Sequence, residues 1–151
     1  MTTASALPTR TLGRTGLEVT RLGYGAMSLD DGRLTPVTPE QAETILHAVL
    51  DAGINLIDTS PDYGMSEECI GRAIAHRRGE YFLASKCGCP VDVPAGTTGH
   101  VYTRQNIVAG VEQSLRRMRT DYLDIVQFHG SPSRQVLEET GAIETLRDLQ
   151  Q

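Results

Sequence analysis

Residues 53–64 read Gly-Ile-Asn-Leu-Ile-Asp-Thr-Ser-Pro-Asp-Tyr-Gly, and this stretch decides the fold. Its apolar residues predict a buried strand over Ile54–Asp58, which ends in the carboxylate of Asp58. Turn-forming residues follow and present Tyr63, before Gly64 bends the chain away. A carboxylate at a strand end with a tyrosine shortly after it is an unusual pair for a purely structural segment. The pair is therefore a candidate for chemistry.

The segment before this strand carries a clear helix start. Thr38 can act as an N-cap, Pro39 suits the first helical position, and Gln41 completes a capping box. Apolar residues then recur at helical spacing as far as Gly53, which favours a helix end. The sequence therefore predicts a helix over 38–53 that is followed at once by a strand.

The alternation of strand and helix continues along the chain. Ser66 is the expected cap of a second helix, with Glu67 and Glu68 in its first turn, where the helix dipole favours acids. Strand and helix repeated four times after a hairpin indicate right-handed βαβ units and a parallel sheet. In order, the expected elements are a hairpin over 10–20, an extended segment over 21–28, the helix over 38–53, a strand over 54–58, a helix over 66–78, a strand over 81–85, a long loop over 87–102, a helix over 103–118, a strand over 121–129 and a helix around 143–149.

Three of the four expected strands end in a polar side chain, namely Asp58, Lys86 and His129. The carboxyl ends of parallel strands all point to one face, and chemistry is done at that face in parallel-sheet folds. We therefore expect these three side chains to lie close together, with Tyr63 in the turn beside them.

These four side chains suit the reduction of a carbonyl group. A carbonyl that accepts hydride becomes an alkoxide, which needs a proton. Tyr63 is a suitable acid, Lys86 would favour its phenolate, and Asp58 would keep Lys86 charged. His129 could donate to the carbonyl oxygen or shuttle the proton. Taken alone, each residue also has a structural explanation, such as capping, packing or solvation, but their joint placement favours catalysis.

Composition limits the classes of function. The chain has 151 residues, enough for one domain with a substantial core. Its net charge of −5 argues against a nucleic-acid surface. No run of about 18 apolar residues occurs, so no membrane span is expected. No secretory signal is visible either, and a cytoplasmic location is expected.

The cysteines and the remaining histidines are assigned no role. Cys69, Cys87 and Cys89 are an odd number without C-x-x-C spacing, which argues against a disulfide framework. Cys87 and Cys89 could belong to a zinc site, but no second pair of soft ligands lies at a suitable spacing, so no metal is expected. The remaining histidines are interpreted as surface residues; they are His47, His76 and His100.

The chain resembles the aldo-keto reductase family in five stretches. They are Arg10-Thr-Leu-Gly-Arg-Thr-Gly-Leu, Leu22-Gly-Tyr-Gly-Ala-Met, Asn55-Leu-Ile-Asp-Thr-Ser-Pro-Asp-Tyr-Gly, Leu83-Ala-Ser-Lys-Cys-Gly and residues 114–129. The resemblance implies a TIM barrel that reduces small aldehydes or ketones with NADPH and without metal. The implied catalytic tetrad, with Tyr63 as proton donor, is Asp58, Tyr63, Lys86 and His129.

The resemblance also implies where a cofactor and a substrate would lie. Gly25, Ala26 and Met27 correspond to a segment near the cofactor, and Asp58 would contact it as well. Residues 87–102 correspond to a loop that sets the range of substrates. The preference for NADPH over NAD rests on resemblance alone, because the residues that distinguish the two belong to the other half of the barrel.

A (β/α)8 barrel needs about 250 residues, so this chain corresponds to its N-terminal half. The expected fold class is α/β: four strand–helix units preceded by a β-hairpin, with residues 1–8 as a flexible tail and 9–151 as one partial barrel domain. The first and fourth strands would be open edges. We expect a truncated chain that is weak or inactive alone, or else a homodimer or a pair with a complementing C-terminal half.

Two other functions stay open at this point. The chain could be a non-catalytic regulatory or interaction module on the same fold, or an unrelated half-barrel whose polar strand ends coincide by chance. The four reactive groups favour the enzyme, since a binding module has no need of all of them.

Overall fold

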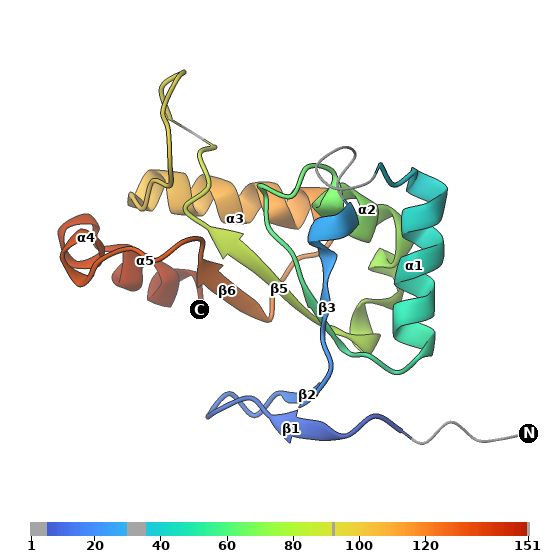
Figure 1. Cartoon of the computed structure of the whole chain (residues 1–151). Coiled ribbons are helices and arrows are strands. Elements are labelled where there is room, and N and C mark those ends of the chain that lie inside the picture. Colours follow the sequence, from blue (N-terminus) through green and yellow to red (C-terminus); the bar gives the residue numbers. More distant parts are fainter. Residues whose placement is uncertain (1–5, 30–35, 92, 151) are drawn as a thin grey trace, which may run out of the picture.

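The computed structural model describes residues 6–29, 36–91 and 93–150, so residues 1–5 of the expected tail lie outside the described residues. Figure 1 shows the arrangement of the elements. They are β1 (Thr9–Thr11), β2 (Glu18–Thr20), β3 (Tyr24–Gly25), the 3-10 helix η1 (Ala26–Leu29), α1 (Pro39–Asp51), β4 (Leu56–Asp58), α2 (Ser66–Ala73), the 3-10 helix η2 (Ala75–Glu80), β5 (Phe82–Cys87), α3 (Arg104–Met118), β6 (Ile125–Phe128), α4 (Arg134–Thr140) and α5 (Ala142–Leu149).

The strands form two sheets. Strands β1 and β2 pair antiparallel, which confirms the expected hairpin. Strands β3, β4, β5 and β6 form a parallel sheet in that order, so that each crossover moves the chain one strand along. Sheet order equal to chain order is what one half of a (β/α)8 barrel requires. The expected parallel sheet is therefore confirmed.

The strands place alternate side chains on opposite faces of this sheet. Ile57 is fully buried in the core under the helices, so the next residue, Asp58, points to the other face. Ser85 also points to the helices, because its hydroxyl donates to Glu67 of α2 at 2.8 Å. Its neighbour Lys86 therefore shares the face of Asp58. We call this face, defined by Asp58 and Lys86, the site face.

Two apolar cores lie between the sheet and its helices. The larger core joins η1, α1 and α2 to strands β4 and β5, and includes Leu46, Ile57, Ile70 and Leu83. The smaller core joins the end of β5 to α3 and α5 around Cys87, Tyr102, Ile107 and Ala142. Figure 1 shows α1, α2 and α3 following one another along the sheet. The cores fix the strand ends on which the polar residues stand.

The start of α1 is as expected, and the start of α2 is not. Thr38 and Gln41 form a capping box. Ser66, by contrast, is the first residue of α2, and the N-cap is Met65, which makes no side-chain cap hydrogen bond. The buried Ser66 hydroxyl instead donates to the Ala26 carbonyl oxygen at 2.9 Å and lies 2.8 Å from the hydroxyl of Thr59. The expected cap is therefore wrong, because tertiary partners take the hydroxyl.

Glu67 lies in the first turn of α2, as expected, but it is buried. Its side chain is only 1% exposed; it accepts from Ser85 and lies 3.4 Å from the guanidinium of Arg117. Burial raises the pKa of the Glu67 carboxyl above its usual value. The α2 helix is also shorter than expected, because it ends at Ala73 and gives way to η2.

The C-terminal segment forms two helices where one was expected. Gly141 has a φ of +63°, which ends α4, and α5 starts at the next residue. Within α5 the buried residues are Ala142 and Thr145, whereas Ile143 is 38% exposed. Of the expected apolar stripe, Leu146 packs against the smaller core, whereas Ile143 and Leu149 are exposed. Among the described residues, no helix is long and apolar enough to cross a membrane.

Candidate active site

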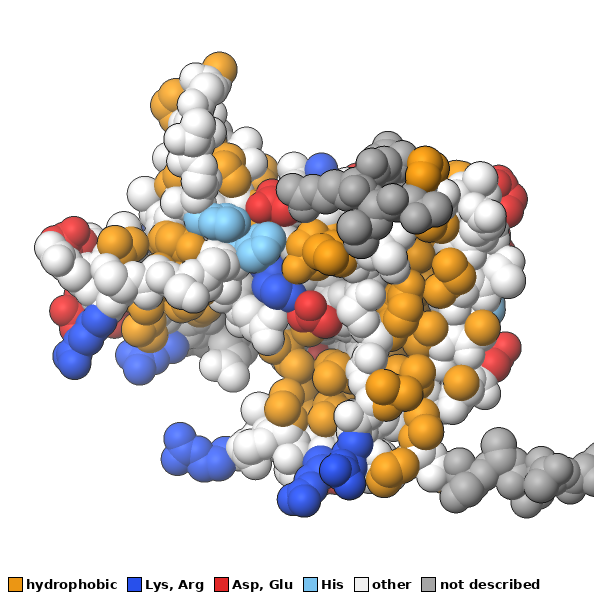
Figure 2. Space-filling view, in the orientation of Figure 1, with side chains coloured by type: hydrophobic (Ala, Val, Ile, Leu, Met, Phe, Trp, Pro, Cys, Tyr) orange, Lys and Arg blue, Asp and Glu red, His pale blue; other side chains and the backbone are white. Residues whose placement is uncertain are grey.

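Asp58 and Lys86 form an ion pair at the carboxyl ends of adjacent strands. The Lys86 ammonium donates to Asp58 Oδ1 at 2.5 Å and to the carbonyl oxygen of Thr59 at 3.0 Å. The Lys86 side chain is 12% exposed and that of Asp58 is 39% exposed. The ammonium thus has two oxygen acceptors, one from each of two consecutive residues at the end of β4. Figure 2 shows basic, acidic and histidine side chains grouped together in this view.

Strand register explains why this pair forms. Asp58 lies opposite Ala84 in the parallel ladder, and the Thr59 amide donates to the Ala84 carbonyl oxygen at 2.9 Å. Lys86 lies two residues beyond Ala84 on the same face, so its long side chain can reach back to the shorter strand. The pair therefore follows from the offset between the ends of β4 and β5.

Tyr63 stands in the turn after β4. The Tyr63 amide donates to the Ser60 carbonyl oxygen at 3.1 Å, and the Tyr63 carbonyl oxygen accepts from the Ser66 amide at 2.9 Å. The ring meets His129 edge to face, with 5.8 Å between ring centroids and 89° between planes. The turn thus places the Tyr63 ring against His129, which follows β6.

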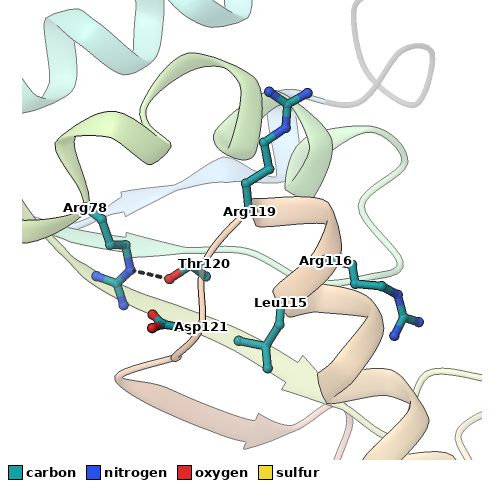
Figure 3. A pocket seen from close by; sticks show the side chains of 6 residues that line it. All are labelled: Arg78, Leu115, Arg116, Arg119, Thr120 and Asp121. Carbon is teal, nitrogen blue, oxygen red and sulfur yellow. Dashed lines mark hydrogen bonds between the residues drawn. The ribbon is translucent and has the colours of Figure 1, made fainter.

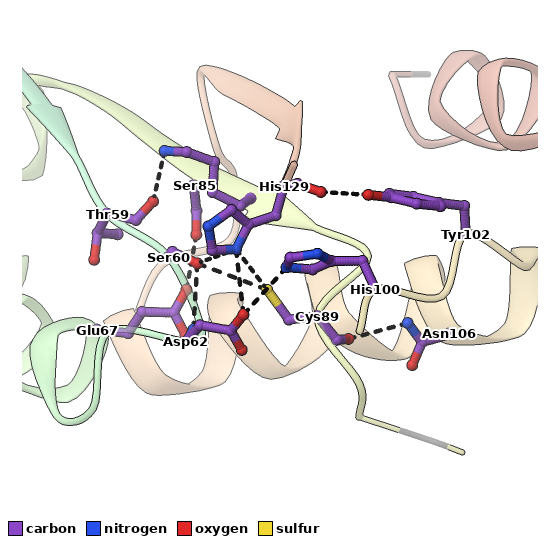
Figure 4. A network of polar contacts seen from close by, with 11 residues as sticks. Thr59, Ser60, Asp62, Glu67, Ser85, Cys89, His100, Tyr102, Asn106 and His129 are labelled. Atoms are coloured by element: carbon purple, nitrogen blue, oxygen red, sulfur yellow. Dashed lines mark hydrogen bonds and ion pairs between the residues drawn. The ribbon is translucent and has the colours of Figure 1, made fainter. Parts of the chain in front are cut away.

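His129 continues the line of β6 at the next strand end. Its amide donates to the Cys87 carbonyl oxygen at 2.8 Å, and its carbonyl oxygen accepts from the hydroxyl of Tyr102. The ring nitrogen Nδ1 lies 3.1 Å from Ser60 Oγ, 3.2 Å from Cys89 Sγ and 3.3 Å from Asp62 Oδ2. Figure 4 shows these groups converging on one side of the imidazole.

Two possible donors and one acceptor face Nδ1 of His129. Ser60 Oγ accepts the Asp62 amide at 3.2 Å, which leaves its own proton free to be donated to Nδ1. Burial raises the pKa of the Cys89 thiol to about 12, so the thiol keeps its proton and is a second donor. Donation from Ser60 and Cys89 to Nδ1 favours the tautomer with the ring proton on Nε2, whereas the Asp62 carboxylate, 3.3 Å from Nδ1, can only accept and favours the proton on Nδ1.

Burial also favours the neutral form of His129. It lowers the pKa of this imidazole below its usual value, with a further contribution from nearby His100, and Asp62 opposes both. A neutral imidazole can donate a hydrogen bond from one nitrogen without carrying charge. The neutral ring can therefore still orient a carbonyl oxygen when its proton lies on Nε2.

His100, expected to be a surface residue, is partly exposed and also contacts the group of side chains around His129. Its side chain is 28% exposed and lies 3.3 Å from Asp62 Oδ2, and its ring centroid is 4.6 Å from that of His129. His100 stands in the long 87–102 loop, whose chain path cannot be read from apolar periodicity. Cys89 stands in the same loop, whereas Asp62 stands in the turn after β4, where it was interpreted only as a turn-forming residue. The only signal was the number of glycines and prolines that marked the loop.

The segment expected near a cofactor lies beside Asp58. Gly25 pairs in register with Asp58, and a Cβ added at Gly25 would meet nothing within 4 Å. Ala26 is buried, whereas Met27 is 43% exposed. A Cβ at Gly23 would instead lie 3.3 Å from Leu56, so packing explains that glycine. Open space beside Gly25 fits a ligand on the site face.

A separate hollow lies at the opposite end of the sheet. It is formed where α3 ends and the chain turns into β6, and Figure 3 shows its lining. The lining residues are Arg78, Leu115, Arg116, Arg119, Thr120 and Asp121. Arg78 has a structural role, because it donates to the Thr120 hydroxyl at 3.1 Å and forms an ion pair with Asp124 at 2.6 Å. The hollow lies at the amino ends of the strands, away from Asp58, Lys86 and His129, and no chemistry is assigned to it.

Comparisons with known proteins agree with this arrangement. A sequence model of the aldo/keto reductase family matches residues 21–151. An uncharacterised oxidoreductase of Bacillus subtilis (strain 168) is 35% identical over 146 residues, which cover 94% of this chain and 44% of that protein. A structure of an aldo-keto reductase from Bacillus halodurans in its holo form matches with a TM-score of 0.78 and 35% identity, over 95% of this chain and 46% of that one.

Another relative is named as a channel subunit and not as an enzyme. A probable voltage-gated potassium channel subunit beta from Oryza sativa subsp. japonica is 32% identical over 87% of this chain and 40% of its own length. This chain thus spans about half the length of the proteins it matches. Together with the four-stranded parallel sheet, the coverage confirms the expected fold as half of a (β/α)8 barrel.

Proposed function

This chain belongs to the aldo/keto reductase family, and from that premise we propose that it is an oxidoreductase acting on small aldehydes or ketones with NADPH. The observation that carries the proposal is the Asp58–Lys86 pair at 2.5 Å on the site face, with the Tyr63 ring against His129 nearby. Their separate positions in the sequence make a chance grouping a poor explanation.

Each of these side chains has a definite role in the proposal. NADPH, when bound, supplies the hydride. Tyr63 gives its hydroxyl proton to the carbonyl oxygen, and the charge on Lys86 favours the phenolate that remains. Asp58 holds the Lys86 ammonium in place through the 2.5 Å contact. His129 orients the carbonyl oxygen through the proton on Nε2.

The residues proposed to hold the cofactor are Gly25, Ala26, Met27 and Asp58. The support is the open space beside Gly25 and its register with Asp58. These residues make only one side of a cofactor site. We therefore propose that the chain by itself is a weak catalyst.

The edges of the sheet are the proposed contact surfaces. Among the described strands, β3 and β6 each have a single partner. We propose that these edges pair with further strands, either from a second copy or from a complementing C-terminal half. Size-exclusion chromatography with light scattering tests the first of these, because a well-dispersed monomer at high concentration would rule out the second copy.

A regulatory subunit is the second candidate, favoured by the likeness to the rice protein named as a channel subunit. The two candidates differ in turnover. A regulatory module could bind NADPH without reducing any carbonyl, whereas the reductase must do both. Fluorescence titration with NADPH followed by assays on a panel of aldehydes separates them.

Tyr63→Phe is the sharper test of the reductase. It should reduce turnover about 10²–10⁴-fold and leave NADPH affinity nearly unchanged, because only the acid is removed. Tyr122→Phe is the matched control, since Tyr122 is 47% exposed and stands before β6 at the other end of the sheet. Retained turnover in Tyr63→Phe would reject Tyr63 as the acid, and no NADPH binding at all would reject a reductase made of this chain alone.

A further inference from the structure

We propose that Asp62, Cys89, His100 and His129 form a binding site for a zinc-class divalent transition metal ion. Each residue offers one ligand atom, and the four atoms all lie within 4.8 Å of one another. Figure 4 shows that these side chains come from the turn after β4, the long loop after β5 and the end of β6. The site adjoins the Asp58–Lys86 pair but does not include it.

The spacing of the ligand atoms suits tetrahedral coordination. Zinc ligands at about 2.0–2.3 Å in a tetrahedron lie roughly 3.3–3.6 Å apart. Here His129 Nδ1 is 3.2 Å from Cys89 Sγ and 3.3 Å from Asp62 Oδ2, and His100 Nε2 is 3.3 Å from the same carboxylate oxygen. Three of the edges therefore already have nearly the length that a bound ion would impose.

The four donor atoms favour a metal ion of intermediate softness, such as zinc. One thiolate, one carboxylate and two imidazoles are a typical zinc donor set, whereas magnesium and calcium prefer oxygen ligands alone. On coordination the Cys89 thiol becomes a thiolate and its proton passes to solvent. The two anionic ligands then balance the two positive charges of the ion. A site without net charge is favoured because burying an unbalanced charge is costly, and Cys89 is only 2% exposed and His129 21% exposed.

The surrounding residues hold the ligands in place before any metal binds. Asn106 is fully buried, donates to the carbonyl oxygens of Cys89 at 3.0 Å and Val101 at 2.8 Å, and accepts from the Val91 amide at 2.9 Å. It therefore clamps both ends of the loop that carries Cys89 and His100. Outer contacts of this kind orient metal ligands.

Glycine at position 130 makes room for the second histidine. Gly130 has a φ of +81°, and a Cβ placed on it would lie 3.3 Å from the His100 nitrogen Nδ1. The His100 ring can therefore lie against the end of β6 with Nε2 turned to Asp62. A bound ion would link the long loop, the turn and β6 at one point, and would use the Nδ1 side of His129.

Cobalt(II) is the probe that tests the site, because its spectrum reports the ligands. Titration of the full chain with Co²⁺ in the presence of a phosphine reductant should saturate at one ion per chain. It should give visible bands of tetrahedral intensity and a thiolate charge-transfer band in the near ultraviolet, and Zn²⁺ should displace it. None of these readouts depends on reductase activity.

Matched variants locate the ion. Cys89→Ser should abolish the charge-transfer band, while Cys69→Ser should keep it, because Cys69 is a buried cysteine of α2. His100→Ala should weaken Co²⁺ binding by more than about tenfold, since even indirect partners of a metal change affinity by roughly that factor. His76→Ala, an exposed histidine, should leave binding unchanged.

Clear outcomes would overturn the proposal. A charge-transfer band that survives Cys89→Ser, or equal affinity of His100→Ala and His76→Ala, would place the ion elsewhere. Binding that fails to saturate at one ion per chain would leave no specific site. If Cys89→Ser does not fold by circular dichroism, the comparison of the two histidine variants still decides, because both lie in exposed or loop positions.

Discussion

Replacement of Gly71 by alanine should disrupt the contact between α2 and α3. The added Cβ would lie 2.8 Å from Met118 Cα and 2.9 Å from Met118 C, and closer still to the carbonyl oxygen of Arg117. These are backbone atoms in the last turn of α3, so no side chain can rotate away. The two helices would have to separate by roughly 1 Å to restore ordinary contact distances.

The cost of that separation can be worked from the packing. A gap of about 0.5–1 Å forfeits a quarter to a half of each dispersion contact across an interface. Ile70, Ile74 and Met118 are fully buried in the same core, so all of them would be affected. Overpacking of this kind costs about 3 kcal/mol, which for a chain of this size lowers Tm by about 6–12 °C.

Thermal unfolding followed by circular dichroism measures this effect. Gly79→Ala is the matched control, because a Cβ at Gly79 meets nothing within 4 Å. That variant should be neutral or more stable by up to about 1 kcal/mol, since alanine restricts the unfolded chain. Equal Tm values for Gly71→Ala and Gly79→Ala would refute the close approach of α2 and α3.

Three further changes test other parts of the fold. Thr38→Ala should lower the free energy of unfolding by about 1 kcal/mol in urea titrations, because the capping box is lost; no change would mean that the cap contributes nothing. Glu67→Gln should gain stability relative to the parent chain as pH rises from about 4 to 7. The reason is that burial raises the Glu67 pKa, so the native state loses stability when that carboxyl ionises and the amide does not; a pH-independent difference would contradict this. Asn106→Ala should open the 87–102 loop and accelerate proteolysis there, because three backbone partners lose their hydrogen bond; an unchanged cleavage rate would show that the loop is held by other contacts.

Local sequence signals predicted the elements whose causes are local. The capping box at Thr38 involves residues three apart, and the hairpin is similarly short in range. Alternation of strands and helices was enough to predict a parallel sheet. Because the carboxyl ends of such a sheet must share one face, the meeting of Asp58 and Lys86 also followed from the sequence.

Other features depended on partners far away in the chain. Ser66 resembles a cap in sequence, but its hydroxyl is taken by Ala26 and Thr59 once η1 packs on α2. Glu67 stands in the first helical turn as the sequence indicates, but its burial depends on β5, which brings Ser85 to it. Periodicity could not predict these outcomes, because it reports only which residues are apolar.

The sequence by itself determined the parallel half-barrel and the strand ends that carry Asp58, Lys86 and His129. Only the tertiary structure decided that Asp62, Cys89 and His100 gather around His129. The physical reason is that strand direction is set by a short apolar pattern, whereas the 87–102 loop has no such pattern. Its path is fixed by Asn106, by the Tyr102 hydroxyl on the His129 carbonyl, and by the space beside Gly130.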